Sequence, residues 1–372
     1  MSLFDYSERL DRLRHIAQER HADAVAMVPG ANMVYFTGLH YHLMERPTIA
    51  LALSGGGMAF ILPELEYTKL QPRMEELDVR ELFLWSDKAG YAGAFEQAAE
   101  KLALRGGVLG VDDMTMRVFE WLAFSAHAPG LHVAGMGQDL LNLRAIKTEP
   151  EIDAMRRAVK LSETALEETL AQVKPGMTER QIQQILKSRL QANGSHGEAF
   201  SPIVLVGPNS GNPHGDVGDN VLKESEFLLF DFGGVIDGYP ADITRTFCIG
   251  TPTDEMTAIY NAVLRANEAA RLVVKPGVTT GEIDHAAREV IEEAGYGELF
   301  MHRTGHGLGL EVHEMPQVAA GVETELQAGM VFTIEPGIYK AGLGGVRIED
   351  NIVVIEDGGE SLTSFPRRMT IG

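Results

Sequence analysis

Cysteine is almost absent from this chain of 372 residues, because Cys248 is the only one. A single cysteine excludes an intrachain disulfide and is typical of a protein that folds in a reducing compartment. Long hydrophobic runs are also missing: no apolar stretch approaches the roughly 20 residues that a membrane-spanning helix needs. The first twenty residues carry charges throughout, so no secretory hydrophobic segment is expected there. We therefore expect a cytoplasmic protein that spans no membrane.

Positive charge is scarce as well. The chain has 32 Lys and Arg against 53 Asp and Glu, which gives a formal net charge of -21 at pH 7. This balance argues against nucleic acid or an anionic membrane as a partner, because both attract basic surfaces. The H-E-x-x-H and G-x-S-x-G signatures and a Walker lysine are absent too. The glycines from Gly305 to Gly309 do not form a dinucleotide-binding loop, since Leu310 and Val312 stand where the next glycine would be required.

The length favours two domains, and 45% hydrophobic residues suffice for buried cores. The first part of the chain alternates between two patterns. Amphipathic helices are expected over 6–20, 91–104 and 114–126, and short apolar strands over 24–28, 48–53, 58–62 and 108–111. This alternation predicts an α/β domain over 1–139, followed by a linker over 140–150 and a second domain over 151–372.

Residues 32–47 stand out within the first domain, because the segment gathers His40, His42, Glu45 and Arg46. We interpret it as a loop. It is either a binding rim or a solvated connection, and the residues alone leave both interpretations open.

An internal repeat organises the second domain. Val173-Lys174-Pro175-Gly176 recurs as Val274-Lys275-Pro276-Gly277, 101 positions later. Long amphipathic helices over 151–171 and 254–273 precede the two copies. After each copy comes a capping box that opens a second helix: Thr178 with Gln181, then Thr279 with Glu282. The pattern predicts two related half-domains.

Each half-domain then carries an acidic hairpin. In the first, an apolar run ends at Asp231, a glycine-rich turn follows, and the chain returns through Asp242. With the turn centred near Ile236 and Asp237, the two aspartates should lie opposite one another. Glu335 and Glu349 hold the corresponding places in the second half. Four carboxylates around one cleft would repel each other unless cations were bound, and two divalent ions would neutralise them. For a lone aspartate pair, two solvated strand acids would be an equal alternative.

Histidines accompany the acids. The segment 302–314 contains His306 and His313 among glycines, which allow close approach of the backbone. His214 holds a similar place in the first half. One histidine in such a loop is more often a surface residue, but three beside a paired acidic framework favour a site.

These residues give the chain a marked resemblance to a known family. From Pro213 to Glu349 it resembles the pita-bread metallopeptidases, whose fold is similar to that of methionine aminopeptidase and creatinase, and within them the Xaa-Pro dipeptidase (prolidase) and aminopeptidase P branch. The resemblance implies a creatinase-like N-terminal α/β domain for capping and dimerisation. It also implies a pseudo-twofold catalytic domain with a curved antiparallel sheet covered by helices. By resemblance the metal ligands are Asp231, Asp242, His306, Glu335 and Glu349. Pro240-Ala241 departs from the family, which more often has a serine beside the aspartate.

The function implied by this resemblance is hydrolysis of the Xaa-Pro bond of dipeptides at a dinuclear metal centre. Mn²⁺ is favoured, with Co²⁺, Zn²⁺ or Fe²⁺ as alternatives, and the ions would lower the pKa of a shared water. Glu335 would also shuttle a proton to the leaving nitrogen. His214 and His313 would hydrogen-bond the substrate, Arg347 would brace the carboxylates or form a structural ion pair, and Arg303 would clamp the carboxylate of a C-terminal proline unless it is a surface arginine.

Other functions remain open at this stage. Aminopeptidase P activity on longer peptides is the nearest, and a non-peptide hydrolase or lyase of the same fold, resembling ectoine hydrolase or creatinase, is another. A binding module that keeps the fold without catalysis is the third, although such a protein should have lost ligands. We expect short proline-containing peptides as partners and a homodimer.

Overall fold

The computed structural model describes residues 4–370 and divides into two compact units, Met1–Arg144 and Ala145–Gly372. The first unit therefore continues beyond residue 139, where the sequence placed its end. The reason is α6 (Gly137–Ala145), which the sequence analysis assigned mostly to a linker. Its residue Leu143 is buried and accepts a hydrogen bond of 3.0 Å from Tyr35, so the helix belongs to the first core.

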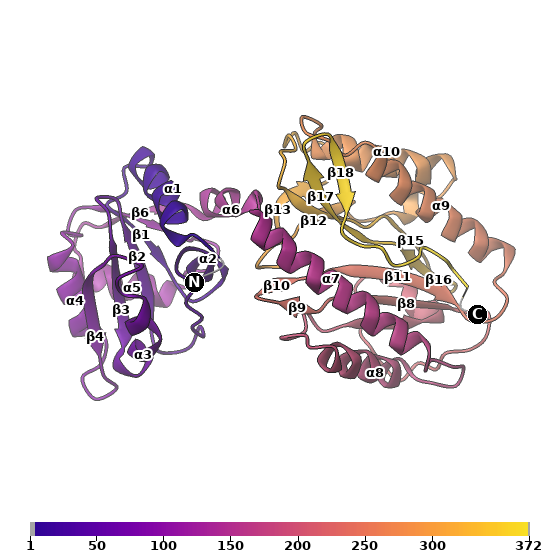
Figure 1. Cartoon of the computed structure of the whole chain (residues 1–372), viewed down its shortest axis with the longest axis horizontal. Coiled ribbons are helices and arrows are strands. Elements are labelled where there is room, and N and C mark those ends of the chain that lie inside the picture. The colour runs from indigo at the N-terminus through magenta and orange to yellow at the C-terminus, as the bar shows by residue number, and fades with distance from the viewer. Residues whose placement is uncertain (1–3, 371–372) are drawn as a thin grey trace. The chain divides into compact units, whose positions relative to one another are not determined.

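The first unit is an α/β domain built on a six-stranded mixed sheet in the order β4-β3-β2-β1-β5-β6 (Figure 1). Its remaining elements are α1 (Tyr6–Glu19), β1 (Ala24–Met27), α2 (Ala31–Thr37), β2 (Ile49–Leu53), β3 (Met58–Pro63), η1 (Glu64–Glu66), α3 (Tyr67–Leu70), η2 (Gln71–Arg73), β4 (Val79–Trp85), α4 (Ala92–Lys101), β5 (Val108–Val111), α5 (Val118–His127) and β6 (His132–Gly135). The expected strands and helices form at nearly the expected places, and the structure adds β4 and β6 at the two edges of the sheet.

The segment 32–47 is only partly a loop, which corrects the sequence interpretation. Its first residues belong to α2, and Asn32 is buried there. The Asn32 amide donates to Asp112 at 2.6 Å and accepts from Arg144 at 2.8 Å. Near the other end of the segment, Arg46 pairs with Asp87 at 2.8 Å. Half of the segment therefore serves the first unit's own packing.

The second unit is a duplicated α+β domain. It contains α7 (Glu149–Leu170), α8 (Glu179–Ala192), β7 (Ile203–Val206), η3 (Gly207–Gly211), β8 (Phe227–Phe232), β9 (Val235–Ile236), β10 (Tyr239–Pro240), β11 (Ile243–Cys248), α9 (Asp254–Leu272), α10 (Thr280–Glu293), η4 (Gly297–Leu299), β12 (Gly305–Gly307), β13 (Glu314–Val318), β14 (Val331–Ile334), β15 (Gly337–Lys340), β16 (Gly344–Arg347), β17 (Asp350–Ile355) and β18 (Gly358–Ser361). Antiparallel sheets run in the orders β11-β8-β7 and β13-β12-β14-β17-β18. In Figure 1, α8 and α10 lie at opposite sides of this unit with strands between them. The expected fold class is confirmed.

The capping boxes of the repeat form as predicted. Thr178 and Gln181 cap α8, and Thr279 and Glu282 cap α10. Each half then packs its helix pair against its own strands: one core contains Ile182, Leu186 and Phe230, and the other contains Ile283, Ala287 and Phe332. Burial of these apolar faces, at about 25 cal/mol per Å² of apolar surface, is the main force that holds helices on sheets.

The register of the first hairpin differs from the prediction. Its turn is centred on Asp237 and Gly238, whose φ angles of 52° and 87° are both positive. Asp-Gly in this conformation makes a two-residue turn of type I′, which matches the twist of the flanking strands. Asp231 consequently pairs with Thr244, and Asp242 lies two positions before Thr244. Because side chains alternate along a strand, Asp242 and Thr244 share a face, so the two aspartates are diagonal neighbours rather than direct partners.

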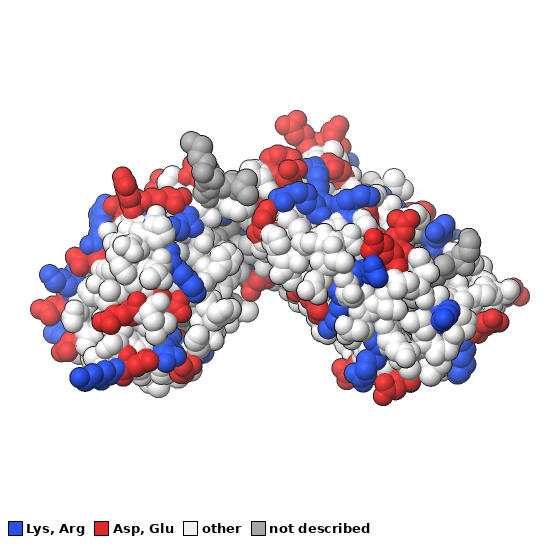
Figure 2. All heavy atoms as spheres, turned by 60° about the horizontal axis from the view of Figure 1, so that its bottom comes forward, with Lys and Arg blue, Asp and Glu red and all other residues white. Residues whose placement is uncertain are grey.

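Two further observations concern the surface. On the described part of the face in Figure 2, Lys and Arg side chains are interspersed with Asp and Glu over each unit. No helix among residues 4–370 combines the length and the apolar character that crossing a membrane would require.

Candidate metal centre and active site

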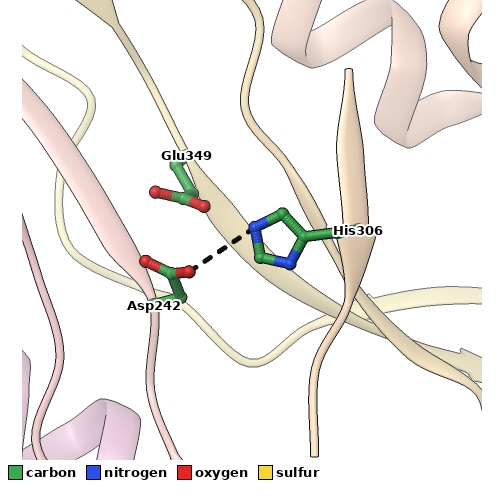
Figure 3. Close-up of side chains that lie close together, drawn as sticks. All are labelled: Asp242, His306 and Glu349. Atoms are coloured by element: carbon green, nitrogen blue, oxygen red, sulfur yellow. Dashed lines mark ion pairs between the residues drawn. The ribbon is translucent and has the colours of Figure 1, made fainter. Parts of the chain in front are cut away.

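Three side chains from in or beside three different strands converge in the second unit. Asp242 lies just before β11, His306 lies in β12, and Glu349 lies just before β17. One ligand atom from each residue falls within 4.8 Å of the others, and all three residues are buried. Figure 3 shows both carboxylates directed towards the imidazole, with His306 Nε2 at 3.6 Å from Asp242 Oδ2. Two oxygen donors and one nitrogen donor at this spacing could hold a transition metal ion.

Two more acids border this cluster. Glu335 Oε1 lies 3.4 Å from His306 Nε2. Ile334 pairs with Asp350 in one strand pair, and Gly337 pairs with Arg347 in the next. Continuing this register through the residues between the two pairs places Glu335 opposite Glu349. Asp231 accepts a hydrogen bond from Arg347 through Oδ2, whereas its buried Oδ1 has no hydrogen-bond partner among residues 4–370. An unpartnered buried carboxylate oxygen is costly, and a bound cation would satisfy it.

The electrostatics of the cluster point the same way. Burial and then the Glu349 carboxylate raise the pKa of Asp242 well above its ordinary value. Burial raises the pKa of Glu335 to about 8, with Arg347 opposing the shift. Burial lowers the pKa of His306 to about 3, which leaves its ring neutral with a lone pair free to coordinate. The pKa values of these buried acids stay raised although Arg347 lies nearby. A divalent cation bound between the acids and the neutral imidazole would stabilise their ionised forms.

The five ligand candidates line one cavity of about 660 Å³ together with the other residues singled out in the sequence, namely His214, Arg303, His313 and Arg347. The His313 ring lies 4.3 Å from the His306 ring at 90°. Arg303 donates a hydrogen bond to Gln317 and is half-buried. Arg347 is buried, and its guanidinium also donates to the Tyr339 hydroxyl at 2.7 Å.

Sequence reasoning missed part of this lining. His302 lines the cavity, and its Nε2 lies 2.8 Å from the Tyr339 hydroxyl oxygen. His302 begins the same glycine-rich segment as His306, which was an available signal. Phe200, Ile203 and Val312 add an apolar wall to the cavity. Nothing in the local pattern marks Phe200, because only the fold brings it to this place.

A duplicated antiparallel domain with a buried cluster of acids and one histidine at a cavity is typical of a metal-binding enzyme. Comparison with known proteins makes the class specific. Residues 153–356 match the family described as metallopeptidase family M24, and residues 9–146 match the creatinase/prolidase N-terminal domain. The chain belongs to metallopeptidase family M24, which confirms the family resemblance seen in the sequence.

Solved structures agree over the whole chain. A dipeptidase, PepE, from Mycobacterium ulcerans is 33% identical with a TM-score of 0.91, and the match covers 100% of this chain and 98% of that one. A prolidase from Thermococcus sibiricus is 32% identical with a TM-score of 0.92 and 99% coverage of both chains. An X-Pro aminopeptidase from Thermotoga maritima is 32% identical with a TM-score of 0.85, covering 97% of this chain and 99% of its own.

Proposed function

We propose that this metallopeptidase is an Xaa-Pro dipeptidase that uses two divalent ions, with Mn²⁺ favoured. Asp231, Asp242, His306, Glu335 and Glu349 would hold the ions. The observation that carries the proposal is the unpartnered Asp231 oxygen in a cavity that four other ligand-type side chains line. Similarity to a dipeptidase and a prolidase over nearly the whole chain supports the choice of substrate.

The bound ions would supply water ionised near neutral pH. The positions of the chain's own residues support a role for each. Glu335 lies at the edge of the cluster, beside His306, and is the candidate to carry the water's proton to the proline nitrogen. His214 and His313 would hydrogen-bond the substrate, and Arg347 would hold Asp231 through the ion pair they already make.

Arg303 would determine the length of the substrate. Its guanidinium borders the cavity and would bind the carboxylate of a C-terminal proline, which only a dipeptide places next to the scissile bond. In the structure this group donates to Gln317. Gln317 pairs with His306 across β12 and β13, so the same hydrogen bond orients Arg303 towards the cluster.

Hydrolysis assays test the proposal directly. The protein is reconstituted with Mn²⁺ and given Gly-Pro, Leu-Pro and Leu-Pro-Gly, with creatine and ectoine as non-peptide substrates. We expect cleavage of the two dipeptides and little of the others. Cleavage of the tripeptide alone would establish the second candidate, an Xaa-Pro aminopeptidase, which the Thermotoga maritima likeness favours. Turnover of creatine or ectoine without peptide cleavage would refute both.

Three smaller proposals accompany this function. The first unit, expected over 1–139, would act in capping and dimerisation, and short proline-containing peptides would be the physiological substrates. The protein would work in the cytoplasm as a homodimer. Sedimentation of the purified protein tests the dimer.

A further inference from the structure

Glu179, the first residue of α8, is a fully buried acid outside the metal cluster. Its carboxylate accepts four hydrogen bonds. Oε1 accepts from Val206 N at 2.9 Å and Asn209 Nδ2 at 2.8 Å. Oε2 accepts from Gly218 N at 2.8 Å and Asn220 Nδ2 at 3.0 Å. These partners are all neutral N–H groups, so the acid is held by dipoles.

Three of the four donors lie near the two ends of one loop, and the fourth, Val206 N, belongs to the strand residue that directly precedes it. The loop leaves β7 after Val206 and runs to Asn220. At its tip stand Pro213 and His214, which both line the cavity of the metal cluster. His214 is exposed, and its backbone is held locally by the Asn212 side chain at 3.2 Å. Fixing both ends of the loop on one carboxylate is therefore a means of fixing the tip.

The internal repeat does not place an acid at the equivalent position of the second half. The position 101 residues later is Thr280, at the start of α10. Thr280 is fully buried as well, but its hydroxyl makes no hydrogen bond within residues 4–370. A helix of the same repeat thus begins without a buried carboxylate. In the first half, this position is a carboxylate that binds the loop carrying His214.

We propose that Glu179 is a positioning residue for His214, acting through the loop Gly207–Asn220. The proposal rests on the function proposed above, in which His214 binds the substrate. Displacement of a substrate-binding group by about 1 Å can reduce the rate by about 100-fold. Glu179 thus links the start of α8 to the geometry of the active site.

The test compares Glu179→Gln with the native enzyme. Glutamine keeps the size of the side chain, but its amide nitrogen would face two N–H donors that the carboxylate accepts. We expect faster hydrogen–deuterium exchange in the peptides that cover residues 207–220 of the metal-free protein. We also expect kcat/KM for Leu-Pro to fall between about tenfold and about 100-fold. Unchanged exchange in that loop, in a folded variant, would overturn the proposal.

A double-mutant cycle separates positioning from general damage. If Glu179 acts through His214, Glu179→Gln should lower kcat/KM much less in a His214→Ala background than in the native one. Additive losses would contradict the proposal. Thr178→Ala is the matched control, because it weakens the cap of the same helix and leaves the four hydrogen bonds in place. It should lower stability without changing loop exchange or kcat/KM.

Two precautions keep the outcomes distinct. Should Glu179→Gln fail to fold, Asn209→Ala removes one donor from the loop side and should show the same exchange pattern in smaller degree. If the native enzyme fails to cleave Xaa-Pro dipeptides, the proposed function falls. The exchange experiment still decides whether Glu179 orders the loop, since it needs neither metal nor substrate.

Discussion

Removal of one acid from the metal cluster should stabilise the metal-free protein and destabilise the metal-loaded one. Glu349 is 2% exposed, and burial, followed by the charges of Glu335 and Asp231, raises its pKa well above the ordinary value. Without cations these carboxylates repel one another. Glu349→Gln keeps the shape of the side chain and removes one charge. Thr244 Oγ1, which donates to Glu349 Oε2 at 2.6 Å, still finds an oxygen acceptor.

The expected gain in stability is estimated from the Coulomb repulsion between two carboxylates, reduced because one of them can take up a proton. Two unit charges 4 Å apart repel by about 4 kcal/mol at an effective dielectric constant near 20. Proton uptake reduces that cost, since each pKa unit corresponds to about 1.4 kcal/mol. We expect the metal-free variant to gain about 1–2 kcal/mol in free energy of unfolding. For a domain of this size, each kcal/mol gained raises Tm by about 2–4 °C.

The assay is thermal unfolding of the native protein and the variant, each with EDTA and with Mn²⁺. In EDTA the variant should melt at the higher temperature, and in Mn²⁺ at the lower, because it loses a ligand. Glu356→Gln is the control, since Glu356 is exposed and the change removes the same charge. A Glu349→Gln protein that melts below the native protein in EDTA would refute the repulsion argument.

Three further predictions concern substrate, metal and core. Arg303→Met should raise KM for Leu-Pro about tenfold or more, as expected for loss of a charge-assisted hydrogen bond worth about 1.5–3 kcal/mol. Any residual cleavage of Leu-Pro-Gly should change little. Equal losses on both peptides in steady-state kinetics would exclude a carboxylate clamp. Chelation of the metal should abolish activity. Mn²⁺ at 100 times its Kd should restore about 2.7 kcal/mol of stability, measured by calorimetry. An unchanged Tm would argue against a structural metal site. Phe230→Ala, at a fully buried site one residue before Asp231, should cost about 3–5 kcal/mol in urea unfolding, and a loss below 1 kcal/mol would mean that the strand repacks.

Local chemistry made much of the second unit predictable. Thr178 and Thr279 each precede a Gln or Glu by three positions, and this spacing alone places the start of α8 and α10, because the pair satisfies free N–H groups at a helix end. The family-specific residues gave the cluster as well: Asp242, His306 and Glu349 lie together as the resemblance implied. Their roles as ligands stay a proposal.

The parts that escaped the sequence depend on register or on distant contacts. An error of one residue in the turn centre moved the partner of Asp231 to Thr244, because each shift of the turn changes the pairing of the whole hairpin. The edge strand β6 is mostly exposed, so it lacks the apolar signal of the central strands. Tyr339 reaches Arg347 across β15 and β16, a contact that no spacing in the sequence indicates.

The seam between the two half-domains, where β11 contacts Glu349 and Asp350, explains why four acids can be gathered there without unfolding the protein. On the cavity face of β11, Thr244 donates to Glu349, and its carbonyl accepts from Glu349 N at 3.1 Å. The neighbouring side chain, Arg245, points to the opposite face because side chains alternate along a strand. There its guanidinium pairs with Asp350 at 2.8 Å, and both groups are at most 1% exposed. Attraction on one face of the strand thus offsets repulsion on the other. It follows that cation removal should lower the stability of this seam and leave the two halves associated.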